Sequence, residues 1–93
     1  MRILGYIDHP VLKITVFKTD TRLAVKFEDR LLEQTYKFPM QQQLNSLAEV
    51  RQLVEQQLVD FVMQNMQTMR EQQMRALDSL PPVAGENEFE EII

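Results

Sequence analysis

The chain has 93 residues, a formal net charge of −4, 44% hydrophobic and 26% charged residues, and no cysteine. This length suffices for one small core, and the composition is typical of a globular domain rather than a disordered chain. Without cysteine, the chain can form no disulfide and no thiolate metal site, and it has no cysteine nucleophile.

The first ten residues, MRILGYIDHP, do not have the pattern of a secretory signal peptide, because their apolar run is short and is broken by Asp8. No apolar run in the chain approaches the about 20 residues that a membrane-spanning helix needs. We therefore expect a cytoplasmic protein that does not interact with membranes.

Alternating apolar and polar residues predict β-strands over about residues 2–38. The pattern is clear in VLKITVFK and TRLAVKFE, and weaker in RILGYI and RLLEQTYKF. Period-two alternation is typical of antiparallel strands with one buried face. The joints DHP, KTDT and EDR are long enough only for hairpins, so the sequence predicts a four-stranded antiparallel meander.

A long amphipathic helix is predicted over about residues 47–80. Ser46 and Glu49 have the spacing of a capping box, in which each side chain accepts a hydrogen bond from a backbone amide of the first helical turn. Apolar residues then recur mostly in steps of three and four up to Met69 and again at Leu77 and Leu80, and Pro81 and Pro82 end the pattern. The fold class expected is α+β, of the order ββββα, with one domain at 1–80 and an acidic, partly apolar tail at 81–93.

The length of the predicted helix favours a homodimer. A strand of seven residues spans roughly 23 Å, whereas a helix over 47–80 would span roughly 50 Å. The sheet can cover only about half of such a helix, yet the apolar stripe continues to Leu80. A second copy is the simplest cover for this surface. A break near Asn65, which would fold the second half back, is the alternative.

Methionine-rich and acidic-apolar segments are the candidate contact surfaces. Methionine side chains adapt to irregular partner surfaces, and the tail ENEFEEII places apolar residues among acids. We interpret the chain as a small, non-enzymatic interaction or adaptor protein. The residues expected to contact the second copy or an unknown partner protein are Met63, Met66, Met69, Met74, Leu77, Phe89, Ile92 and Ile93.

The second face of the predicted sheet offers an alternative function. Cations and an aromatic ring interleave on it, and such a face can neutralise and stack single-stranded nucleic acid. A solvated face, on which cations keep the sheet soluble, is the simpler interpretation. The residues of this alternative, which we do not favour, are Lys13, Phe17, Arg22, Lys26 and Lys37.

No residue pattern indicates catalysis or a bound cofactor. His9, the single histidine, lies in the short joint Asp8–Pro10, where a turn role is expected. There is no glycine-rich phosphate loop and no spacing typical of a metal site, so we expect neither an enzyme nor a metal, cofactor or small-molecule site.

Charge is distributed unevenly along the chain. Residues 1–38 carry seven Lys or Arg and five Asp or Glu, whereas residues 81–93 carry four glutamates and no cation. The tail thus holds a charge equal to that of the whole protein. Three placements remain open for it: unstructured, packed on its own domain, or docked on another protein or on the basic sheet face.

Overall fold

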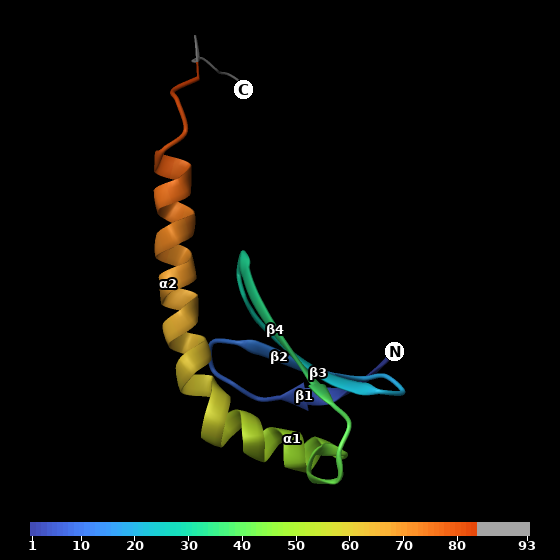
Figure 1. Ribbon diagram of the computed structural model, residues 1–93. Coiled ribbons are helices and arrows are strands. Elements are labelled where there is room, and N and C mark those ends of the chain that lie inside the picture. Colours follow the sequence, from blue (N-terminus) through green and yellow to red (C-terminus); the bar gives the residue numbers. More distant parts are fainter. Residues whose placement is uncertain (84–93) are drawn as a thin grey trace.

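The computed structural model describes residues 1–83, and the remainder of the predicted tail lies outside the described residues. Four antiparallel strands form one sheet in the order β1–β2–β3–β4, each pairing with its neighbour in sequence (Figure 1). The predicted meander is therefore confirmed. The strands are β1 (Arg2–Ile7), β2 (Lys13–Lys18), β3 (Arg22–Asp29) and β4 (Leu32–Pro39).

One long helical segment follows the sheet, as the sequence predicts. The capping box is present: the Glu49 amide donates to Ser46 Oγ at 3.4 Å, and the Ser46 amide donates to Glu49 Oε1 at 3.1 Å. The helix ends at Asp78, two residues before the predicted end. The segment comprises α1 (Leu47–Leu53), a π-helical turn η2 (Val54–Leu58) and α2 (Val59–Asp78), and a short 3-10 helix, η1 (Gln42–Leu44), precedes it.

The helical segment bends at η2 (Figure 1). Here the Val59 amide donates to the Val54 carbonyl, five residues earlier, which makes this turn wider than an α-helical turn. Sharp bends are common at such turns. The alternative break near Asn65 is not observed: Asn65 lies inside α2, and the chain past the bend continues as one helix rather than folding back.

The core lies between α1, the start of α2 and the inner face of the sheet. Gly5 lets α1 approach β1 closely, because a Cβ atom there would lie 2.6 Å from Leu47 Cδ2. The buried apolar residues of the sheet side are Ile7, Leu12, Ile14, Val16, Leu23, Val25 and Phe27, and those of the helical side are Leu44, Val50, Val54, Val62 and Met66.

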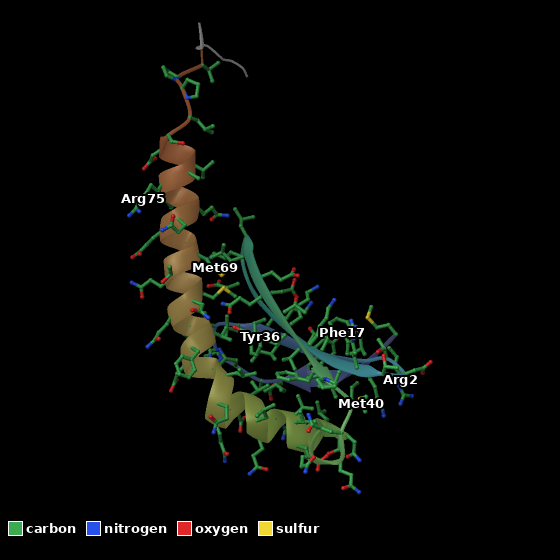
Figure 2. All side chains as sticks on the ribbon, viewed as in Figure 1. Arg2, Phe17, Tyr36, Met40, Met69 and Arg75 are labelled. Atoms are coloured by element: carbon green, nitrogen blue, oxygen red, sulfur yellow. The ribbon has the colours of Figure 1, made fainter. Side chains whose placement is uncertain are left out.

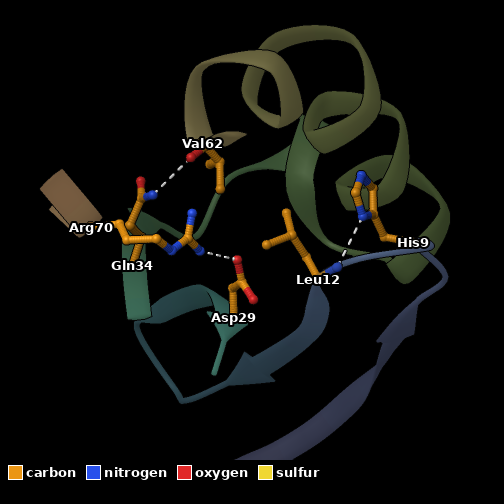
Figure 3. Close-up of polar contacts among 6 residues, drawn as sticks. All are labelled: His9, Leu12, Asp29, Gln34, Val62 and Arg70. Atoms are coloured by element: carbon orange, nitrogen blue, oxygen red, sulfur yellow. Dashed lines mark hydrogen bonds and ion pairs between the residues drawn. The ribbon is translucent and has the colours of Figure 1, made fainter. Parts of the chain in front are cut away.

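Polar contacts hold α2 beside β3 and β4 after the bend (Figure 3). Gln34 Nε2 on β4 donates to the Val62 carbonyl at 3.0 Å, and Tyr36 Oη donates to Gln34 Oε1 at 2.8 Å. Arg70 Nη2 contacts Asp29 Oδ2 at the end of β3 at 2.6 Å. These contacts fix the direction in which α2 leaves the sheet.

Replacing Gln34 by methionine should loosen α2 in particular. The variant keeps the side-chain length but loses both hydrogen bonds, and we expect the free energy of unfolding to fall by about 1–2 kcal/mol. Amide exchange should accelerate more in α2 than in α1. Gln72→Met, an identical change at an exposed position of α2, is the control. Equal effects of the two substitutions would contradict a clamping role for Gln34.

Candidate functional site

The last part of α2 extends beyond the sheet. Arg70 contacts Asp29 in the β3–β4 hairpin, and the helix then continues for eight residues, about 12 Å, to Asp78 (Figure 1). Apolar side chains are exposed in this part of α2, where Met74 is 52% and Leu77 54% exposed, and just after it, where Leu80 is 64% exposed. We call these three residues the α2 overhang.

Leu77, in the α2 overhang, continues the helix face that forms the core. Positions 62, 66, 69, 73 and 77 are separated by three or four residues, so they lie on one side of the helix. Val62 and Met66 on this side are buried and Met69 packs against the core, whereas Leu77 has no sheet beneath it. Figure 2 shows Met69 directed towards the sheet and Arg75 directed away from it.

The structure separates the predicted contact residues into four groups: exposed, half-buried, buried in the core, and outside the described residues. Met74 and Leu77 are exposed, Met63 is only slightly less so, and Met69 is half-buried against the core. Met66 is 1% exposed and packs in the core of its own chain, so its predicted contact with a partner would require the core to open. Phe89, Ile92 and Ile93 lie outside the described residues.

The sheet's outer face, opposite α1, forms the second candidate surface. Cross-strand pairing places two rows of residues on it. Neither α1 nor α2 covers this face (Figure 1). One row is Ile3, Phe17, Ala24 and Lys37, and the other is Tyr6, Thr15, Lys26 and Thr35.

Tyr6 and Ile3 were missed by the sequence analysis. The two positions are three residues apart, so strict alternation would place them on opposite faces. A β-bulge between Ile3 and Gly5 adds one residue, and both side chains therefore lie on the outer face. Tyr6 is 55% exposed there, beside Thr15 on β2. No short-range sequence signal marks this bulge.

The predicted cations of the outer face are not equivalent. Lys26 Nζ lies 5.9 Å from the centre of the Phe17 ring, and also 3.8 Å from Glu28 and 4.0 Å from Glu33. Its charge is thus partly neutralised within the sheet. Lys13, Arg22 and Lys37 form no ion pair with any residue in the described part of the chain.

His9 has a structural role in the β1–β2 loop. Its Nδ1 accepts hydrogen bonds from the amides of Val11 and Leu12 at 3.1 and 3.0 Å, and Figure 3 draws the second of these. Both ring-to-backbone contacts are local, as expected for a turn residue. Within residues 1–83, no three His, Asp or Glu side chains are grouped so that they could hold a metal ion.

Comparisons with known proteins add no family. The chain matches no protein-family model, no curated protein and no solved structure. Among the described residues, no helix is both long enough and apolar enough to cross a membrane. The two surfaces defined above, the α2 overhang and the outer face, are therefore the basis for a functional assignment.

Proposed function

We propose that this protein is a non-enzymatic interaction module of the cytoplasm that forms a homodimer through the α2 overhang. The observation that carries the proposal is that Leu77 lies on the same helix face as the buried Val62 and Met66, yet is 54% exposed. Exposed apolar side chains in line with a core are typical of a surface that another protein covers. The adaptor role follows if the same surface, or the tail, also binds other proteins.

Antiparallel pairing of two overhangs suits the shape of the molecule. The described chain measures 59 × 26 × 22 Å, and α2 accounts for much of its length (Figure 1). In an antiparallel pair, the overhang of each copy would lie against the partner's helix near Met69 and Arg70. Each copy would then supply the cover that its own sheet is too short to provide.

The energy available from the overhang alone is modest. Full burial of a leucine or methionine side chain contributes about 1.5–3 kcal/mol, so three half-exposed side chains contribute roughly 2–5 kcal/mol per copy. Association costs at least about 4 kcal/mol in lost translational and rotational freedom. We therefore expect a weak dimer, unless further contacts join the two copies.

Leu77→Asp should abolish the dimer while preserving the fold, because a charge would have to be buried between the copies. Sedimentation should show a monomer, with an unchanged circular dichroism spectrum. Gln72→Asp, which places the same charge on another side of α2, should leave the dimer intact.

Met66→Asp places the same charge at a buried position of α2, for comparison with Leu77→Asp. We expect Met66→Asp to unfold the chain, because the charge would enter the chain's own core. A wild-type chain that remains monomeric at high micromolar concentration would refute the proposed dimer.

A second candidate function is the binding of single-stranded nucleic acid on the outer face. The observation that favours it is the exposure of Tyr6 one residue row from Phe17, on the sheet face that also carries Lys26 and Lys37. Bases stack on aromatic side chains of a sheet, and neighbouring cations neutralise phosphates. The partial neutralisation of Lys26 by Glu28 and Glu33 weighs against tight binding.

A mobility-shift titration at low salt tests this candidate. If the outer face binds single strands, Tyr6→Ala should weaken the affinity about 10-fold, because each stacked base contributes about 1–3 kcal/mol. Phe61→Ala removes an exposed aromatic ring from α2 and is the control, with no change expected. No shift with a fluorescent oligothymidylate at low salt would eliminate this function.

A further inference from the structure

Four cations lie at the end of the sheet remote from α2, one pair on each face. Arg2 and Lys18 face each other across β1 and β2, in register with the buried Leu23 of the inner face. Arg22, at the start of β3, and Lys37, two residues before the end of β4, lie on the outer face. Figure 2 shows Arg2 at this end, far from Arg75 on α2. We call these four residues the cationic end.

The charges of the cationic end are largely uncompensated. The ion pairs in the described part of the chain involve Lys26 and Arg70 as cations, and none of the four residues of the cationic end. Asp20 is the one carboxylate that lines the adjoining surface. Two hollows of about 420 and 250 Å³ lie there, the first lined by Arg2 and Lys18 and the second by Arg22 and Lys37. Because they share Met1 and Thr19, an extended chain that passes over this end of the sheet could contact both pairs of cations.

The backbone beneath this surface is held by hydrogen bonds. The Thr19 amide donates to the Arg22 carbonyl at 2.9 Å, and the Arg22 amide donates to Thr19 Oγ1 at 3.0 Å. The Met40 amide, just after β4, donates to the Thr21 carbonyl at 3.2 Å. The β2–β3 turn is thereby joined to the end of β4, which keeps Arg22 close to the chain that carries Lys37.

We infer that the cationic end binds the acidic segment 86–91 of a second copy of this chain, an inference that rests on the proposed homodimer. Charge complementarity is the first argument. The segment ENEFEE carries four glutamates and no cation, while residues 1–83 carry ten cations and ten acids. Carboxylates form their strongest pairs with arginine and lysine side chains that lack other partners.

The reach of the chain argues against binding within one copy. Arg22 is seven residues from Asp29 along β3, or about 23 Å. Beyond Asp29, α2 carries the chain roughly 12 Å further away from the sheet. Even Glu91, the last residue of the segment, is only eight residues past Val83, up to about 26 Å of extended chain, which is less than these two distances together, so the segment falls short of the cationic end of its own copy.

In an antiparallel dimer the same segment has a shorter path. The end of the partner's α2 would lie beside Arg70, close to the β3–β4 hairpin. Eight extended residues, 84–91, span up to about 26 Å, which matches the length of β3. Phe89 would then meet the row of Ile3 and Phe17, where apolar surface is already exposed.

A charge exchange in the full-length chain tests this inference by sedimentation at low salt. One variant reverses the cationic end with Arg2→Glu, Lys18→Glu, Arg22→Glu and Lys37→Glu. The other reverses the segment with Glu86→Lys, Glu88→Lys, Glu90→Lys and Glu91→Lys. Each variant alone should dimerise at least about 10-fold more weakly than the wild type, since like charges would meet.

An equimolar mixture of the two variants should form a heterodimer about as tightly as the wild type forms its homodimer. In the mixed pair, acidic segments meet the intact cationic end and basic segments meet the reversed one. Contacts within a single copy could not be rescued by mixing, so an absence of rescue would overturn the inference. A wild type that dimerises as tightly as both variants would also overturn it, and a monomeric wild type would instead refute the proposed function.

Two controls keep the result interpretable. Arg22→Gln with Lys37→Gln removes charge without reversing it, and should weaken the dimer about 3-fold or more at low salt but not at high salt, where charges are screened. This variant replaces the quadruple reversal if the latter fails to fold. Binding of a fluorescent oligothymidylate is the other control. If the oligothymidylate binds the wild type through these four cations, and if reversing the four charges leaves dimerisation unchanged, then nucleic acid is the occupant of the cationic end and the inference fails.

Discussion

The mismatch between a four-residue apolar repeat and the α-helical pitch determines the shape of this molecule. Apolar residues lie at positions 50, 54, 58, 62 and 66. In a regular α-helix, four residues turn roughly 40° more than one full turn, so each apolar side chain would lie roughly 40° further round the helix than the one before it. Over sixteen residues the apolar face would turn away from the sheet. The wide turn η2 takes up the excess, so that Val50, Val54, Val62 and Met66 all remain buried.

The bend decides which part of α2 remains exposed. Because α1 covers the inner face and α2 then turns along one end of the sheet, Leu77 and Leu80 extend past the last strand residues that could cover them. The outer face is uncovered for a different reason, because both helices lie on the other side of the sheet (Figure 1).

The sequence was sufficient to predict the meander, the capping box and the long helix, because each depends on local patterns of two to four residues. It also predicted that the helix is longer than the sheet is wide or long, because the lengths of both follow from their numbers of residues. The position of the bend was not predicted, although the repeat of four was visible from Val50 to Met66. Tyr6 was missed because it reaches the outer face through a β-bulge, which depends on strand pairing. Gln34 was missed because its partner, the Val62 carbonyl, is 28 residues away in the sequence.

Electrostatics favour one orientation of the proposed dimer. Apolar contacts between two overhangs are weakly directional, so Met74, Leu77 and Leu80 alone would permit parallel or antiparallel pairing. A parallel pair would bring two segments of charge −4 together at the same end and leave both cationic ends without a partner. An antiparallel pair separates the acidic segments and directs each towards the other copy's Arg22 and Lys37. The apolar surface would thus supply attraction, and the charges would select the arrangement.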